Sequence, residues 1–367
     1  MEKVLNILLY LFKVFPLKKN NILLIEGRNN FFTGNCRSIF EKLKNKKDLK
    51  FIVISDKEKK IKKTNLKVVR YMSLETIYYL STSKYCFFTS SQGNNLYKRK
   101  NQIFINLWHA AGAFKKFCYD AEVKKEKNEK IKKSIDLVII SSEKVQEIYS
   151  NALGIEKSKV KNLGIPRADI FFREEEKQRV REEFYKNYPE LKNKKIILYA
   201  PTFRDNEKNK FNLKLDIELM KKNLEELDYI LLLKLHPGIK SKDIQVDDKF
   251  SYNFSDYSNT ADLLIVSDIL ISDYSSIIFE FSIMKKPILF YAYDVEEYIK
   301  DRGFYYNYYD FIPNKINYTT EELIKAIMNQ EWDLERIEKF ARYFFNPFDG
   351  NSTERVLKEV GLWEEDK

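Results

Sequence analysis

The sequence is poor in cysteine, glycine and proline, and each shortage excludes a class of protein. Its 367 residues include only 3 Cys, 10 Gly and 8 Pro. Three widely separated cysteines cannot build a disulfide framework, which favours a reducing compartment and argues against a clustered Cys/His metal site. The low glycine and proline content excludes a collagen and a low-complexity linker protein. A hydrophobic fraction of 44% suffices to bury substantial cores, and the length predicts two domains.

Motifs that mark several common enzyme classes are also missing. The chain contains no GxxxxGK[ST], no GxGxxG after its first predicted strand and no GxSxG, so kinase, NAD-dependent and serine hydrolase functions lose their main support. It has no Asp-x-Asp pair, which often holds a nucleotide diphosphate through a metal ion. We therefore predict no protein-bound metal and no cofactor, with phosphate charge neutralised by a helix start, hydroxyls, lysine and histidine.

The charge balance is basic without pointing to nucleic acid. Lys and Arg number 65 against 54 Asp and Glu, which gives a net charge of +11. Lysine supplies most of the positive charge, whereas recognition of nucleic acid usually relies on arginine. Arg-rich patches interleaved with aromatic residues are not seen in the sequence, so we expect no nucleic-acid partner. The positive charge does suit anionic phosphates or an anionic membrane surface.

The amino-terminal segment is apolar but too short to span a membrane. Residues Val4–Leu17 read VLNILLYLFKVFPL, whereas a spanning helix needs about 20 apolar residues. The segment also lacks the cleavage site of a secretory signal. Its apolar stripe consists of Leu5, Leu8, Leu9, Phe12 and Phe15. We predict that residues 1–19 form an amphipathic membrane-associating helix on an anionic leaflet, the alternative being a helix packed on the first domain.

Short apolar runs alternate with helical patterns along the rest of the chain. The strand-like runs form two series: Asn21–Ile25, Leu49–Ser55, Tyr85–Thr89, Ile103–Trp108 and Asp136–Ser141, then Lys195–Ala200, Tyr229–Leu235, Ile269–Ser272 and Pro287–Tyr291. Helical patterns lie at Glu143–Leu153, Glu174–Tyr188, Ile217–Leu227 and Asp262–Val266. This alternation predicts two doubly wound, Rossmann-type α/β domains with an interdomain cleft. The predicted parts are residues 20–172 and 173–345, followed by a C-terminal helical tail at 346–367.

Both histidines of the chain lie at the ends of predicted strands. His109 closes the run IFINLWH, and His236 closes YILLLKLH. Ligands of doubly wound folds bind beyond the carboxyl ends of the strands, so both side chains are expected to face the cleft. A neutral imidazole can take a proton from an attacking hydroxyl, and a protonated one can hold phosphate oxygens. We predict two functional histidines, the alternative being two ordinary strand-end residues.

A second group of candidate residues follows the strand that ends at Ser272. Asp273-Tyr274-Ser275-Ser276 opens a helix, whose free N–H groups and serine hydroxyls would cradle a diphosphate. Plain N-capping by Ser272 or Asp273 is the alternative. Thr202 also comes just past a strand, which favours a ligand site. The candidate phosphate partners are Lys234, Arg204 and Arg302, and Glu280 could accept from ribose hydroxyls or face solvent.

Taken together, these segments resemble the CDP-glycerol glycerophosphotransferase family of teichoic acid synthesis, from about Ile22 to Arg355. The matching pieces are LWHAAGAFKKF (Leu107–Phe117), GIPRADIFF (Gly164–Phe172), ILYAPTFRD (Ile197–Asp205), LLLKLHP (Leu231–Pro237), Asp262–Tyr298, Arg302–Tyr308 and Asp349–Val356. The resemblance implies a GT-B-like fold, with the acceptor on the N-terminal domain and CDP-alditol on the C-terminal one. It also implies that His109 and His236 are catalytic and that Ser275 and Ser276 contact the donor diphosphate.

Within that family, the segment WHAAGAFKK and the short chain look more like the glycerol-phosphate primases than the polymerases. The resemblance then implies transfer of glycerol phosphate from CDP-glycerol to an undecaprenyl-diphosphate-linked N-acetylmannosaminyl-N-acetylglucosamine, with release of CMP. The enzyme would be peripheral, on the cytoplasmic face of the cell membrane. Cys118 departs from the glycine expected there. Glycerol- or ribitol-phosphate polymerisation, a GT-B nucleotide-sugar glycosyltransferase and a homo-oligomer stay open.

Overall fold

Two parallel β-sheets form the centres of two structural units. The computed structural model describes residues 2–27, 32–56, 65–91, 96–121, 134–202, 204, 213–235 and 249–364. The first unit comprises Met1–Gly112, Phe117–Asp169 and Phe344–Lys367, and the second comprises Ala113–Lys116 and Ile170–Tyr343. Each unit is described by itself below.

The first unit contains a seven-stranded sheet of order β3-β2-β1-β4-β5-β6-β7, parallel throughout. The strands are β1 (Lys18–Ile25), β2 (Lys50–Ile54), β3 (Leu66–Val69), β4 (Ser83–Phe88), β5 (Ile103–Asn106), β6 (Leu137–Ile140) and β7 (Val160–Asn162). The winding direction reverses between β1 and β4. In open α/β sheets, ligands bind outside the carboxyl ends of the strands at such a switch point.

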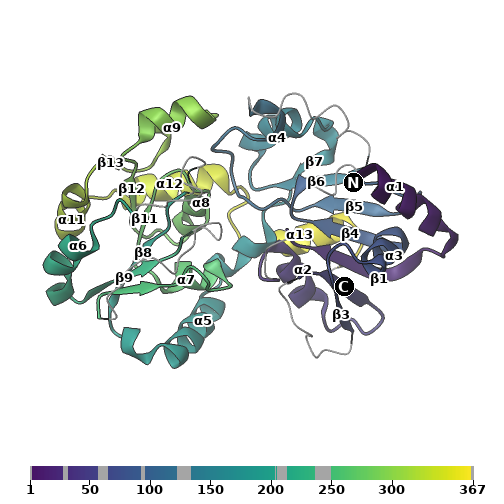
Figure 1. Cartoon of the computed structure of the whole chain (residues 1–367), viewed down its shortest axis with the longest axis horizontal. Coiled ribbons are helices and arrows are strands. Elements are labelled where there is room, and N and C mark those ends of the chain that lie inside the picture. Colours follow the sequence, from purple (N-terminus) through teal and green to yellow (C-terminus); the bar gives the residue numbers. More distant parts are fainter. Residues whose placement is uncertain are drawn as a thin grey trace. The chain divides into compact units, whose positions relative to one another are not determined.

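Helices α2 (Asn35–Leu43) and α13 (Ser352–Glu359) lie side by side and share one core with the sheet (Figure 1). The other helices of this unit are α1 (Glu2–Leu11), α3 (Leu74–Thr82) and α4 (Gln146–Leu153). Helix α13 lies in the segment predicted as a C-terminal tail. Its Val356 and Leu357 are fully buried against α2 and the strands, so this segment is part of the core of the first unit.

The second unit contains a six-stranded parallel sheet of order β10-β9-β8-β11-β12-β13. The strands are β8 (Lys195–Tyr199), β9 (Tyr229–Leu233), β10 (Ser251–Asn253), β11 (Ile269–Ser272), β12 (Ile288–Tyr291) and β13 (Ile316–Asn317). The helices are α5 (Glu174–Asn187), α6 (Ile217–Leu224), α7 (Thr260–Val266), α8 (Ile277–Ser282), α9 (Val295–Arg302), α10 (Tyr308–Phe311), α11 (Thr320–Met328) and α12 (Leu334–Phe344). Helices α6 and α11 cover one sheet face, and the switch point lies between β8 and β11.

The predicted α/β class with two doubly wound domains is confirmed. Every predicted strand and helix has a counterpart, but the helix predicted over residues 1–19 is too long: α1 ends at Leu11, a short 3-10 turn follows at Phe12–Val14, and β1 begins at Lys18. Four observed strands were not predicted, namely β3, β7, β10 and β13. Each of them is the outermost strand of its sheet.

Helix α1 packs on its own unit through one side and exposes apolar side chains on another. It lies beside α3 (Figure 1), with Leu9 only 1% exposed, and its Asn6 Oδ1 accepts the N–H of Tyr97 at 2.6 Å. A second apolar stripe points outward, at Val4, Ile7 and Leu11 with Val14 just beyond, and these side chains are 59–79% exposed. Within the described part of the chain, no helix has the length and apolar character needed to cross a membrane.

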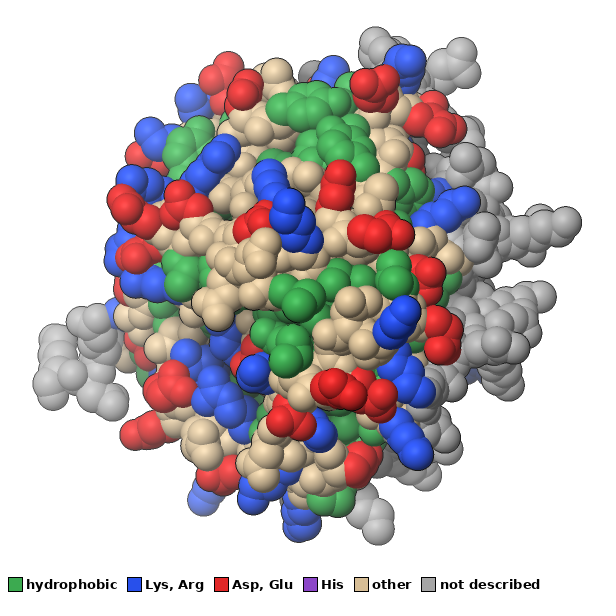
Figure 2. Space-filling model, turned by 90° about the vertical axis from the view of Figure 1, so that its left-hand side faces the viewer, with side chains coloured by type: hydrophobic (Ala, Val, Ile, Leu, Met, Phe, Trp, Pro, Cys, Tyr) green, Lys and Arg blue, Asp and Glu red, His purple; other side chains and the backbone are tan. Residues whose placement is uncertain are grey.

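The surface in Figure 2 carries charges of both signs. Lys and Arg side chains are intermixed with Asp and Glu over this face, and hydrophobic side chains form small separate groups between them. This mixture is typical of a solvated surface rather than of the continuous basic track that nucleic acid requires.

Candidate functional site

The loop directly after β5 is fixed at several points. It contains Trp108, a buried residue whose backbone φ of 50° lies in the left-handed region. It ends at Gly112, whose N–H donates to Ser141 Oγ at 2.9 Å and whose carbonyl accepts from the Tyr149 hydroxyl at 2.8 Å. His109 therefore sits in a loop whose path is defined by hydrogen bonds on the carboxyl side of the sheet.

The His109 imidazole has a defined orientation. Its Nδ1 lies 3.1 Å from the carbonyl oxygen of Thr89, the residue after β4. Because a carbonyl only accepts, Nδ1 carries the hydrogen and the neutral ring keeps its lone pair on Nε2. The ring lies beside the Trp108 indole, with centroids 4.5 Å apart, and the residue is exposed. In this orientation Nε2 is the ring nitrogen that would accept a proton.

Glu26 is a buried carboxylic acid at the same edge of the sheet that was not singled out from the sequence. It directly follows β1 and is 5% exposed, and its Oε1 accepts the N–H of Cys36 at 3.2 Å. Burial raises the pKa of Glu26, against the lowering effects of hydrogen bonds from Thr89 and Cys36 and of the charge of Arg167. The one sequence feature that could have identified Glu26 is its position directly after a predicted strand.

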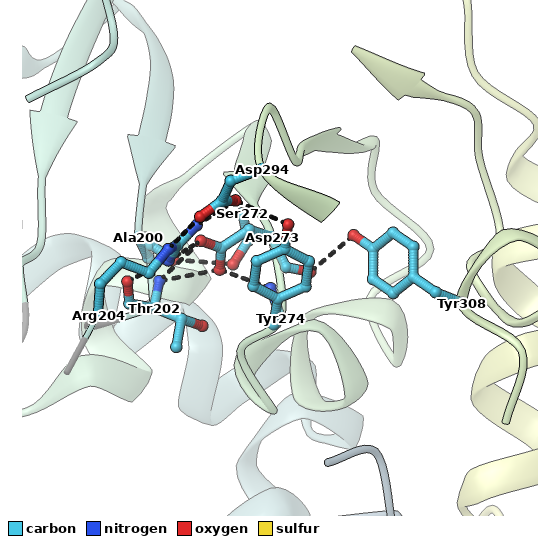
Figure 3. Close-up of polar contacts among 8 residues, drawn as sticks. All are labelled: Ala200, Thr202, Arg204, Ser272, Asp273, Tyr274, Asp294 and Tyr308. Carbon is cyan, nitrogen blue, oxygen red and sulfur yellow. Dashed lines mark hydrogen bonds and ion pairs between the residues drawn. The ribbon is translucent and has the colours of Figure 1, made fainter. Parts of the chain in front are cut away.

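In the second unit, a buried ion-pair network ties together the loops after β8, β11 and β12 (Figure 3). Arg204 Nη1 lies 2.7 Å from Asp273 Oδ2, and its Nε and Nη2 lie 2.8 and 3.0 Å from the two carboxylate oxygens of Asp294. Burial by itself disfavours the charged guanidinium, but Asp273 and Asp294 outweigh it and raise the pKa of Arg204 above its ordinary value. The guanidinium is therefore charged and fully engaged inside the protein.

Neighbouring groups complete this network. The Asp273 carboxylate accepts the N–H of Thr202 at 2.8 and 3.1 Å, and its backbone carbonyl accepts from the Tyr308 hydroxyl at 3.2 Å. The Tyr274 hydroxyl donates to Asp294 at 2.8 Å. The Thr202 hydroxyl is buried and has no hydrogen-bond partner among the described residues. Thr202, Arg204 and Asp273, predicted to bind the donor, are thus brought together at the switch point, where Arg204 and Asp273 fix the loops.

Ser275 and Ser276 are half-buried and precede α8, as predicted. Ser275 Oγ accepts the N–H of Ile277 at 3.4 Å, whereas Ser276 is the N-cap residue and makes no side-chain capping bond. N-capping by Ser272 or Asp273, the alternative drawn from the sequence, is wrong. The Ser272 hydroxyl instead donates to the carbonyl of Ala200 at 2.8 Å, and the Asp273 side chain turns toward the loop after β8.

The remaining predicted site residues lie in different surroundings. Lys234 follows β9 and donates through Nζ to the carbonyls of Ser255 and Tyr257 at 2.7 and 2.8 Å. Glu280 is 6% exposed inside α8, so the alternative that it faces solvent is wrong. Arg302 is exposed at the end of α9. His236 lies outside the described residues, and among those described no group of His, Cys, Asp and Glu could hold a metal ion.

Comparisons with known proteins point to one family. The family of CDP-Glycerol:Poly(glycerophosphate) glycerophosphotransferases matches residues 7–362. The chain is 34% identical to a teichoic acid poly(ribitol-phosphate) polymerase of Bacillus spizizenii over 97% of its length, but it spans only 58% of that relative. It is also 34% identical to the teichoic acid ribitol-phosphate primase of the same organism, over 94% of this chain and 91% of the relative.

A solved structure has the same fold. A variant of the wall teichoic acid polymerase TagF superposes with a TM-score of 0.86 at 24% identity, covering 97% of this chain and 93% of the TagF chain. This likeness confirms the predicted GT-B-like architecture. The family match over residues 7–362 confirms the resemblance drawn from the motifs. The chain belongs to the CDP-glycerol:poly(glycerophosphate) glycerophosphotransferase family.

Proposed function

We propose that this protein transfers glycerol phosphate from CDP-glycerol to a polyprenyl-diphosphate-linked N-acetylmannosaminyl-N-acetylglucosamine in wall teichoic acid synthesis. The product would carry one glycerol phosphate, and CMP would leave. The observation that carries the proposal is the histidine after β5 in a chain of this family, held with Nδ1 on a carbonyl and Nε2 presented as a base. No resident metal or cofactor has a part in the proposed reaction.

The proposed step is a substitution at phosphorus. The acceptor hydroxyl oxygen forms a bond to the glycerol-bearing phosphorus of CDP-glycerol, while the bond from that phosphorus to the bridging oxygen breaks. The hydroxyl proton moves to His109 Nε2, and CMP departs with the electron pair of the broken bond. The Nδ1–H bond to the Thr89 carbonyl supports this role because it fixes the tautomer and stabilises the imidazolium that forms.

The proposed donor site lies at the switch point of the second sheet. The Ser275 and Ser276 hydroxyls and the backbone N–H groups before α8 would hold the diphosphate. The Arg204–Asp273–Asp294 network would keep that turn rigid. Lys234, Arg302 and Glu280 are proposed as further donor contacts, and His236 as the group that stabilises charge on the transferring phosphoryl.

Transfer of ribitol phosphate is the second candidate function. One relative, which this chain matches over 94% of its own length and 91% of the relative's, carries the name ribitol-phosphate primase. Repeated addition is a third outcome to separate, because a polymerase is also among the relatives.

A donor panel tests these proposals. CMP release would be measured from CDP-glycerol and from CDP-ribitol, with and without the lipid-linked disaccharide, and the product mass would be read alongside. We expect acceptor-dependent CMP release from CDP-glycerol with a mass gain of one glycerol phosphate. A mass gain of one ribitol phosphate would show that CDP-ribitol is the donor instead of CDP-glycerol. A ladder of products would show that the enzyme is a polymerase. Turnover only with nucleotide sugars would refute the proposal.

A further inference from the structure

The residue before His109 is held in a strained backbone conformation. Trp108 has a φ of 50°, and a bulky side chain in the left-handed region costs energy that the surroundings must offset. The Trp108 ring packs against Phe117 and Tyr149, with centroids 5.3 and 6.1 Å apart. Contacts that hold the backbone on both sides of Trp108 therefore decide where the His109 imidazole points.

Two side chains make those contacts: Asn106, whose Oδ1 accepts the N–H of Trp108 at 2.8 Å, and Asn35, which binds the carbonyls. Asn35 is 1% exposed, and its Nδ2 donates to the carbonyls of both Leu107 and Trp108, at 3.0 and 2.9 Å. Its Oδ1 accepts the N–H of Arg167 at 2.9 Å. The side chain thus uses both amide hydrogens and its oxygen to join the start of α2, the loop after β5 and the turn that contains Arg167.

Two features fix the position of Asn35. Asn35 is the first residue of α2, and the next apolar residues of this helix, Cys36, Ile39 and Phe40, are fully buried in the core of the first unit. The N–H of Cys36 donates to the buried Glu26 carboxylate. The Asn35 amide therefore acts as a rigid clamp on the carbonyls of Leu107 and Trp108.

We propose that Asn35 is a positioning residue for the reaction: its amide maintains the left-handed turn at Trp108 and so keeps His109 Nδ1 on the Thr89 carbonyl. This inference rests on the proposed function, in which His109 is the base. Loss of the clamp would let the turn relax and the imidazole rotate. A displacement of about 1 Å from productive geometry can cost about 100-fold in rate.

Asn35→Asp is the most direct test because it keeps the shape and the acceptor for Arg167 but puts an oxygen against two carbonyls. Asn35→Ser is the second variant, in case the first does not fold. The matched control is Asn314→Asp in the second unit, because Asn314 Nδ2 also bridges two carbonyls, those of Ile288 and Glu331, at 3.1 and 3.2 Å. Thermal unfolding would be followed for each variant, and kinetics measured well below the transition.

Two readouts separate positioning from plain stabilisation. We expect the Asn35 variants to lower kcat for CMP release by about 10–100-fold, with KM for CDP-glycerol within twofold, whereas Asn314→Asp lowers only the unfolding temperature. The second readout is nitrogen-15 NMR of histidine-labelled protein, in which the ring nitrogen signals of the two histidines would be assigned with His109→Ala. It should show an Nδ1–H tautomer for His109 in the wild type and a tautomer mixture in Asn35→Asp.

A folded Asn35 variant with the wild-type kcat and the wild-type His109 nitrogen shifts would overturn the inference. If the wild type released no CMP from any CDP-alditol, the proposed function would fail, and the NMR comparison would still decide whether Asn35 orients His109.

Discussion

At the scale of single residues, Arg204 joins three loops of the second unit, because its guanidinium pairs with Asp273 after β11 and with Asp294 after β12. The sequence predicts Thr202, Arg204 and Asp273 as donor-binding residues, and the structure brings them together at the switch point. The sequence does not distinguish a side chain that faces a ligand from one that ties two loops together. Arg204 ties loops together because Asp294, from a third loop, also pairs with its guanidinium, and this contact is not visible in the sequence.

Removal of Arg204 is expected to destabilise the second unit strongly. Arg204→Ala leaves Asp273, which is 1% exposed, and its neighbour Asp294 without a counter-ion. Breaking a buried ion pair in this way typically costs about 3–5 kcal/mol. Urea unfolding would measure the loss, with Arg342→Ala as control, because that arginine pairs with Glu338 at the surface. A loss as small as that of the control would contradict the account of the network.

Asp262 gives a pH-dependent prediction at the same scale. Burial and the nearby Glu183 raise its pKa to about 6, although hydrogen bonds from Tyr257 and Asn259 act in the opposite direction. Folding therefore favours the protonated carboxyl. Its stabilising contribution is complete below the unfolded pKa of about 4 and is lost as the pH rises through 6.

Asp262→Asn should remove the loss of stability that the wild type shows as the pH rises through 6. The variant is expected to be more stable than the wild type at pH 7, on the order of 1 kcal/mol after allowance for partial exposure, and about equal to it at pH 4. Chemical unfolding of both proteins at pH 4, 5, 6 and 7 would reveal the difference. A constant difference across this range would show that Asp262 does not titrate in the folded state as described.

At the scale of elements, the sequence predicted the central strands and missed the edges. β1 ends in the buried apolar run ILLI and β8 in the buried run IILY, and such continuous runs are typical of strands covered on both faces. β7 reads VKN and β13 reads IN, and both are short and partly exposed. An edge strand has a neighbour on one side only, so its pattern is weak and its pairing is decided by the sheet that it joins.

Helix α1 is predicted from one apolar stripe. In the structure Leu9 of that stripe is buried, Leu5, Leu8 and Phe12 are half-buried and Phe15 is exposed, and a second stripe points outward. We propose that the outward stripe of Val4, Ile7, Leu11 and Val14 rests in an anionic membrane surface, with the exposed Lys13 ammonium near the headgroups. This placement would bring the enzyme to a lipid-linked acceptor.

Leu11→Asp should weaken vesicle binding at least tenfold, because burial of a leucine side chain is worth about 1.5–3 kcal/mol. Co-sedimentation with phosphatidylglycerol-containing and with phosphatidylcholine vesicles would measure the effect. Met328→Asp is the matched control, since Met328 is 54% exposed at the end of α11. Equal binding of Leu11→Asp and wild type, or no binding by the wild type, would refute the membrane role of α1.

At the scale of the whole molecule, neither unit is a continuous piece of chain. The segment Ala113–Lys116 belongs to the second unit, where Phe114 stacks on Tyr308 and Phe311 with centroids 5.7 and 4.6 Å apart. The C-terminal residues return to the first unit, and α13 completes its core. A linear sequence pattern predicts two series of strands but not these exchanges, because they depend on contacts between residues that lie far apart in the chain.

The measurement that tests the central claim most directly is CMP release by His109→Ala. Wild type and variant would be compared with CDP-glycerol and the lipid-linked disaccharide, alongside thermal unfolding and CDP-glycerol binding. The account predicts at least a 100-fold lower turnover, since acid–base catalysis contributes about 10²–10⁴ in rate, with unchanged unfolding and donor binding. Wild-type turnover by a folded His109→Ala would contradict it.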